Sequence, residues 1–202
     1  MRSNNTGAVH FNFSDSGSLV YVPGPASVSR QSANLVLVDP SNPTGYLKHL
    51  EARTKINIVT RSYLVEALNC YVVGLFKAAA VMVGAAAESI VLLLAEAAVA
   101  RLEHDNKPVP SQLTHWMVRP MTTELARFYD EGIHKKENRE LRERYETYWS
   151  AFTGQIRAVR NDAGHPVSID PVTADTVHAS LLIFPELASL ADALFAWTVD
   201  VP

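Results

Sequence analysis

The chain has 202 residues, the length of one ordinary domain or of a smaller domain with an arm. Hydrophobic residues make up 48% and charged residues 19%, which supplies material for a buried core and excludes global disorder. With 18 Lys and Arg against 21 Asp and Glu, the net charge of -3 excludes the strongly basic composition of an avid nucleic-acid binder, so any such contact has to be local.

The sequence predicts a cytoplasmic protein. Cys70 is the single cysteine, which excludes an intrachain disulfide and a cysteine-based zinc cluster. The polar residues 1–6 are not followed by the apolar run of a secretory signal. The most apolar stretch, Tyr71 to Ala100, is interrupted by charged residues at positions 77, 88 and 96. It therefore favours a core helix over a membrane span, and we expect no membrane association.

Residues 1–45 differ in composition from the rest of the chain. They are rich in Gly, Ser, Asn and Pro, and the prolines and glycine between Pro40 and Gly45 indicate a boundary before helical sequence begins. We expect a β-prone or flexible arm over residues 1–45 and a helical bundle over residues 46–202. The β-prone pieces of the arm are Val9–Phe13, Leu19–Val22 and Leu35–Val38.

From Tyr46 onward the hydrophobic pattern is helical, with breaks at glycine and proline positions. The sequence therefore predicts an all-α fold of four to five helices. Pro185 should kink or divide the last of them, since proline lacks an amide hydrogen and clashes with the preceding turn. The expected helices lie near Gly45–Gly74, Leu75–Glu103, Thr122–Ile133, Lys136–Ala163 and Val172–Val199, the first two being continuous or separate.

The alanine-rich segment from Leu75 to Glu103 is expected at the centre of the bundle. At about 100° per residue, its lysine and its glutamates, at positions 77, 88, 96 and 103, fall within one stripe about 100° wide, so the helix is packed on most sides. Gly84 and the many alanines let neighbouring helices approach closely. Glu88 belongs to this stripe, and two placements stay open for it: close to the core, or at the solvent-exposed edge of the stripe.

The segment from Lys136 to Ala163 carries a regular apolar seam and an outer face of mixed charge. Opposite charges recur three or four residues apart on that outer face, which is typical of a solvated surface. The seam is expected to face the bundle. Its members are Leu141, Tyr145, Tyr148, Phe152, Ile156 and Val159.

This helix ends at a strong stop signal, because Gly164 is followed at two residues by a proline. Gly164 is expected at the first left-handed position beyond the helix cap. In a Schellman ending of this kind, the side chain of His165 folds back over Arg160. The sequence therefore predicts that Arg160 and His165 meet in space.

An arginine beside a histidine supplies the groups that RNA transesterification needs. The guanidinium can clamp a phosphate, and an imidazole at a helix C-terminus can titrate near neutrality and move a proton. The 2′-hydroxyl of RNA is an internal nucleophile, so no metal is required in principle. The same residues also fit a helix stop without catalytic function, and spacing alone does not decide between the two.

The run Arg160-Asn161-Asp162-Ala163-Gly164-His165-Pro166 resembles the signature of the HEPN superfamily. In that signature an Arg, a polar residue directly after it and a His four to six residues beyond the Arg close a bundle helix. The order of helices is similar as well, with an alanine-rich helix carrying Glu88 before the motif and a last helix after it. The resemblance covers about Tyr46 to Val199.

The resemblance implies an up-and-down bundle of four to five helices that forms a homodimer, in which two Arg-His motifs face each other across one cleft. His165 would act as general base on the 2′-hydroxyl, and Arg160 would stabilise the charged phosphorane. Asn161 would position the histidine or the phosphate, and Glu88 would orient the motif. Arg157, one turn before Arg160, is a candidate for a second RNA phosphate contact.

The predicted function is that of a HEPN-like, metal-independent endoribonuclease from a toxin-antitoxin, antiphage or stress system, with RNA as substrate and an antitoxin or regulatory protein as partner. The alternative is a catalytically inactive HEPN-like module for RNA binding, protein interaction or dimerisation. Residues 134–165 hold seven Lys or Arg against five acids, a thin basic patch that dimerisation would double. No cofactor is expected, and the histidine spacings predict no metal site.

Overall fold

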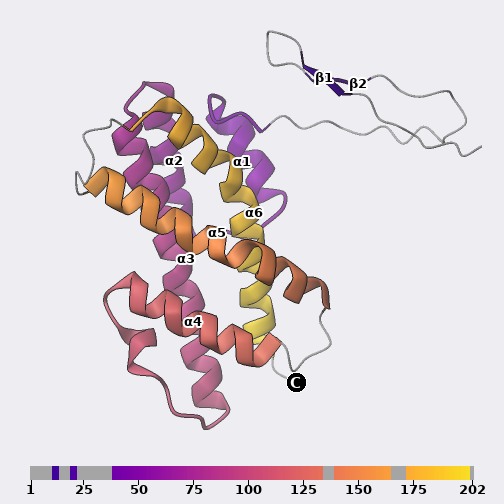
Figure 1. The fold of residues 1–202 in the computed structure, drawn as a ribbon, viewed down its shortest axis with the longest axis vertical. Coiled ribbons are helices and arrows are strands. Elements are labelled where there is room, and N and C mark those ends of the chain that lie inside the picture. The colour runs from indigo at the N-terminus through magenta and orange to yellow at the C-terminus, as the bar shows by residue number, and fades with distance from the viewer. Residues whose placement is uncertain (1–10, 14–18, 22–37, 134–138, 165–171, 201–202) are drawn as a thin grey trace, which may run out of the picture. The chain divides into compact units, whose positions relative to one another are not determined.

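The computed structural model describes residues 11–13, 19–21, 38–133, 139–164 and 172–200 (Figure 1). The chain divides into two compact units, Met1–Val36 and Leu37–Pro202. In the first unit, β1 (Phe11–Phe13) pairs antiparallel with β2 (Leu19–Tyr21). The arm boundary near residue 45 stays a prediction.

The second unit is all-helical, which confirms the predicted fold class at that level. Its described part holds six α-helices, more than the four or five predicted, and one 3-10 turn. The HEPN-like arrangement of these helices stays a prediction. The elements are α1 (Pro43–Glu51), α2 (Ile58–Val72), α3 (Phe76–His104), η1 (Ser111–Thr114), α4 (Val118–Ile133), α5 (Arg139–Gly164) and α6 (Ala174–Val199).

The expectation of one helix over Gly45–Gly74 was wrong, because Asn57 begins a new helix. Its side-chain oxygen accepts a hydrogen bond from the backbone N–H of Thr60 at 2.8 Å, which caps α2. α2 and α3 are also separate. Gly74 adopts a φ of 78° between them, a left-handed conformation that glycine reaches without steric cost.

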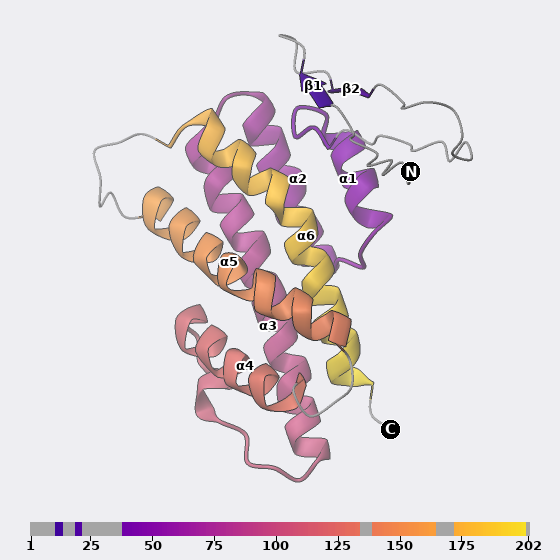
Figure 2. The same cartoon turned by 45° about the vertical axis from the view of Figure 1, so that its right-hand side comes forward.

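α3 is the central helix, as the sequence predicted. It contacts α2, α4, α5 and α6, and α5 crosses over both α3 and α6 (Figures 1 and 2). Small residues such as Ala79, Gly84 and Ala87 are buried along it, which lets the neighbouring helices come close. Glu88 is half-buried on this helix.

Aromatic side chains form the core where α4, α5 and α6 meet. The ring of Tyr129, fully buried on α4, lies 5.7 Å from that of Trp149 and 6.0 Å from that of Trp197, centroid to centroid. On α5, Phe152 is buried as predicted. Tyr148 is half-buried and packs against the core, and Trp149, which the predicted seam left out, is buried beside it.

α6 runs undivided through Pro185, so of the two expected outcomes, a kink or a division, division does not occur. Proline has no N–H to give to the carbonyl four residues earlier, which here belongs to Leu181. The hydroxyl of Tyr46 on α1 donates to that carbonyl oxygen at 2.6 Å. A side chain from α1 therefore supplies the donor that Pro185 lacks.

α3 and α6 are each long and apolar enough to cross a membrane by length and composition. In the bundle, 56% of the most apolar stretch of α3 and 44% of that of α6 are buried. Core helices of globular proteins meet the same criterion. A cytoplasmic location without membrane association stays a prediction.

Candidate ribonuclease site

The last turns of α5 carry three of the predicted site residues, Arg157, Arg160 and Asn161. The structure describes the backbone of these residues and not their side chains, and His165 lies outside the described residues. The helix extends to Gly164, one residue beyond the predicted end. The pairing of Arg160 with His165 stays a prediction.

Helix geometry places the Cα of Arg160 at the edge of the side of α5 that faces the bundle. Arg160 follows Trp149 by eleven residues, which is about three helical turns, so their Cα atoms differ in direction by about 20°. Trp149 is 8% exposed and belongs to the aromatic core. The Cα of Asn161, the next residue, lies about 100° further around the helix axis than that of Arg160.

The end of α5 lies at the same end of the bundle as the start of α6 and the turn between α2 and α3 (Figures 1 and 2). Here the hydroxyl of Tyr71 on α2 and Nδ1 of His178 on α6 are 2.9 Å apart and share a hydrogen bond. Both side chains are half-buried. Sequence reasoning gave His178 no role, because the two partners are separated by 107 positions and no local motif connects them.

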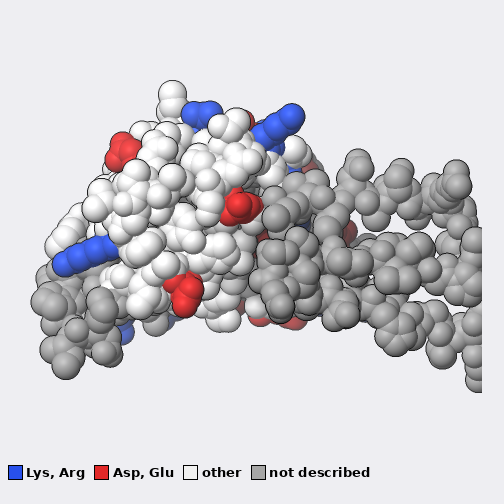
Figure 3. All heavy atoms as spheres, turned by 90° about the horizontal axis from the view of Figure 1, so that it is seen from above, with Lys and Arg blue, Asp and Glu red and all other residues white. Residues whose placement is uncertain are grey.

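The described surface at this end of the bundle is largely uncharged. Seen from above, isolated Lys, Arg, Asp and Glu side chains are surrounded by other residues (Figure 3). Val73 and Leu75 are 67% and 58% exposed at the α2–α3 turn, and Val172 lines the same shallow depression as Leu75 and Phe76. Apolar surface of this kind is typical of protein contacts.

Glu88 has a place in the fold, but its predicted function stays a prediction. It lies on α3, a helix against which α5 packs, and it is half-buried, between the two placements that the sequence left open. Within the described ranges no group of three His, Cys, Asp or Glu side chains could hold a metal ion.

Comparisons with known proteins give no relative for this chain. No family model matches it, and no match was found among curated proteins or among solved structures. The resemblance to the HEPN superfamily therefore depends on the Arg160–Pro166 motif and on the order of the helices.

Proposed function

We propose that the chain is a HEPN-like, metal-independent endoribonuclease. The observation that carries the proposal is the sequence from Arg160 to His165, which begins in the last turn of a bundle helix. α5 packs against α3 and α6 in an all-α unit, which is the setting that the motif requires.

In the proposed reaction His165 takes the proton of a 2′-hydroxyl as general base. The 2′-oxygen attacks the adjacent phosphorus, the bond from phosphorus to the 5′-oxygen breaks, and the departing oxygen takes up a proton. Arg160 stabilises the charge on the phosphorane. Asn161 positions the histidine or the phosphate, and Arg157 contacts a second phosphate. The products are a 2′,3′-cyclic phosphate and a 5′-hydroxyl.

A homodimer would bring two motifs to one cleft and double a basic patch that is thin in one chain. The described charges agree with a weak rather than a strong attraction for RNA, since the end of the bundle shows only isolated Lys and Arg (Figure 3). We place the enzyme in a toxin-antitoxin, antiphage or stress system in the cytoplasm, under the control of an antitoxin or regulatory protein.

The test is incubation of the full chain with total RNA and defined oligonucleotides in EDTA, beside Arg160→Ala and His165→Ala. We expect cleavage that persists in EDTA, leaves cyclic phosphate ends and falls by about a hundredfold or more in both variants. Circular dichroism and thermal unfolding should show both variants folded.

Arg127→Ala is the control, because it also removes one arginine from a bundle helix but lies outside residues 134–165. Arg127 is exposed on α4 and pairs with Glu124 at 3.2 Å. It should retain full activity. Cleavage that requires a divalent metal, or that survives unchanged in Arg160→Ala and His165→Ala, contradicts the proposal.

A second function is favoured by the exposed apolar residues Val73 and Leu75 at the same end of the bundle. The chain would then be a catalytically inactive module that binds RNA or another protein, or that dimerises. Light scattering and RNA-binding measurements distinguish the two functions. If wild type and both motif variants are equally inert as folded dimers, the second function replaces the first.

A further inference from the structure

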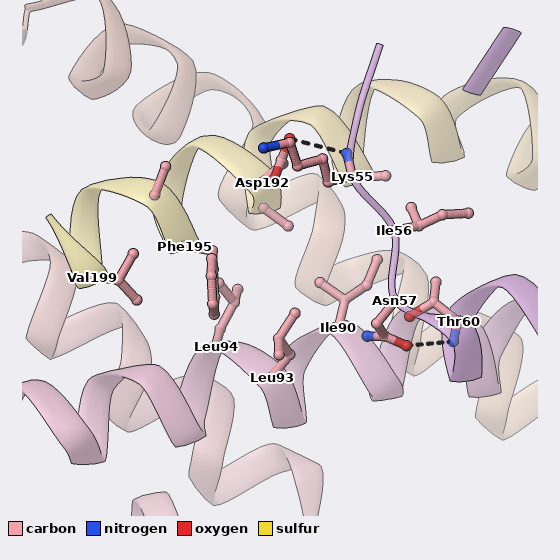
Figure 4. A pocket seen from close by; sticks show the side chains of 13 residues that line it. Lys55, Ile56, Asn57, Thr60, Ile90, Leu93, Leu94, Asp192, Phe195 and Val199 are labelled. Atoms are coloured by element: carbon pink, nitrogen blue, oxygen red, sulfur yellow. Dashed lines mark hydrogen bonds between the residues drawn. The ribbon is translucent and has the colours of Figure 1, made fainter. Parts of the chain in front are cut away.

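A groove of about 420 Å³ opens between the α1–α2 connection, α3 and α6 (Figure 4). Its lining residues come from these elements and the start of α2, and α5 contributes none of them. This volume lies within the range of pockets that bind small molecules. The groove is therefore large enough to hold a ligand and is separate from the residues of the proposed ribonuclease site.

Most of the groove wall is apolar. The side chains of Leu93, Leu94 and Phe195 extend into the space between α3 and α6, with Val199 at one end (Figure 4). Leu94 is buried, while Leu93 and Phe195 are partly exposed in the opening. Transfer of an apolar group from water to this surface would be favourable.

The polar groups of the groove lie toward the α1–α2 connection (Figure 4). Asp192, half-buried on α6, accepts a hydrogen bond at Oδ2 from the backbone N–H of Lys55 at 3.1 Å, which fixes its carboxylate. Asn57 uses its side-chain oxygen to cap α2, and its NH₂ group points into the groove. Lys55 adds an exposed ammonium group.

These three side chains offer one negative charge, one positive charge and one neutral donor. Among the described residues, neither the carboxylate of Asp192 nor the ammonium of Lys55 is within salt-bridge distance of a charged side chain. A ligand with both an ammonium and a carboxylate would satisfy the two charges. The ammonium would bind Asp192, and the carboxylate would bind Lys55.

We propose that this groove binds a small zwitterion with a large apolar group, of the class of free apolar α-amino acids. The apolar side chain of the ligand would lie against Leu93, Leu94 and Phe195. A purely cationic or purely anionic amphiphile fits less well, because each would leave one charge of the groove unpaired and place a like charge near it.

The first experiment measures binding of L-phenylalanine to the full chain by calorimetry and by ligand-observed NMR. Three analogues test the parts of the ligand: 2-phenylethylamine lacks the carboxylate, 3-phenylpropanoate lacks the ammonium and glycine lacks the apolar group. We expect the first two to bind about tenfold more weakly than L-phenylalanine, and glycine to show no binding. Equal binding of all three phenyl compounds, or no binding of L-phenylalanine at millimolar concentration, overturns the proposal.

Variants then locate the site. Asp192→Asn keeps an acceptor for the N–H of Lys55, so it removes the charge that recognises the ligand while retaining the structural contact. It should weaken L-phenylalanine binding by about tenfold. Asp192→Asn should leave the affinity for 3-phenylpropanoate unchanged or raise it, which mere loss of structure would not do.

Ala196→Trp should fill the groove and abolish binding, because Ala196 is exposed on α6 and lines the opening. Ala179→Trp is the matched control, since Ala179 is also exposed on α6 and does not line the groove. If both variants bind L-phenylalanine like wild type, the ligand lies elsewhere and the proposal fails. RNA cleavage is not involved in these measurements, so their outcome is independent of the proposed ribonuclease activity.

Discussion

The two halves of α5 use the same helix in different ways. The first half faces the bundle with Tyr145, Trp149 and Phe152, and its outer face pairs Arg139 with Glu143 at 2.7 Å. The second half carries Arg157 and Arg160 and ends at the glycine stop. On the first half, Arg139 and Arg142 form local ion pairs with glutamates four residues later, whereas the arginines of the second half are grouped toward the helix end.

The difference shows how one helix can separate stability from chemistry. Burial of aromatic rings in the first half anchors α5 to the bundle and thereby determines the position of its last turns. In the proposed function, the motif residues of the second half take part in the reaction rather than in packing. Variants in the first half should change the free energy of unfolding, and variants of the motif should change activity.

The largest expected effect is that of Phe152→Ala. Phe152 is 1% exposed, and its ring lies 5.7 Å from that of Trp149. Truncation removes buried apolar surface and leaves a cavity, so the free energy of unfolding should fall by about 3–5 kcal/mol. Urea unfolding measures it. Arg160→Ala should change the same quantity by less than about 1 kcal/mol; equal losses in the two variants would remove the distinction between the halves.

Smaller changes in the free energy of unfolding are expected on substitution of two helical glycines, and the two changes should have opposite signs. A Cβ added at Gly132 on α4 would clash with the indole of Trp197, whereas one at Gly154, between the two halves of α5, meets nothing within 4 Å. Gly132→Ala should therefore cost about 1–3 kcal/mol through overpacking. Gly154→Ala should stabilise by about 0.5–1 kcal/mol, because alanine has the higher helix propensity. Thermal unfolding of both variants checks the signs, and a stabilising Gly132→Ala would contradict the packing of Trp197.

The smallest effect concerns a surface charge outside α5. The ammonium of Lys107, 2.8 Å from Asp105, together with His104 and Arg101, lowers the pKa of Asp105 to about 2. A depressed carboxyl pKa stabilises the fold above the unfolded value near 4, and this contribution is lost as the pH falls toward 2.

An NMR titration of Asp105 should give this low pKa in wild type and a higher one in Lys107→Ala. The stability difference between the two proteins should be constant above pH 5 and shrink between pH 4 and pH 2. This stability difference measures the contribution of one surface ion pair, with which the ion pairs of α5 can be compared. An unchanged Asp105 pKa in Lys107→Ala would show that this pair is not formed in solution.

Much of the fold could be predicted because its signals are local. The spacing of Leu141, Tyr145 and Phe152 predicts which side of α5 is buried, and the alanines of α3 predict a central helix. Tyr148 and Trp149 both lie near the edge of the apolar stripe, so spacing alone could not choose between them. The break before α2 was missed, although Asn57 is a good capping residue, because the apolar pattern continues across it.

The two candidate sites also differ in whether their residues lie close together in the sequence. Arg160 and His165 can be recognised from sequence because they are five positions apart, Arg160 in the last turns of α5 and His165 directly after its last residue in the sequence. The groove between α3 and α6 could not, because Lys55 and Asp192 are separated by 137 positions and meet only after α1, α2 and α6 have packed. Tyr71 and His178 are hidden from sequence reasoning for the same reason.

The contact between Tyr46 and the carbonyl of Leu181 makes the continuity of α6 depend on α1. A chain that begins at Leu37 keeps this donor, whereas a chain that begins after α1 leaves a buried carbonyl without one. Tyr46→Phe should therefore cost more in wild type than in a Pro185→Ala background, where the backbone N–H is restored. Tyr46 and Pro185, 139 positions apart in the sequence, thus depend on each other structurally. The short helix α1 therefore belongs to the minimal domain.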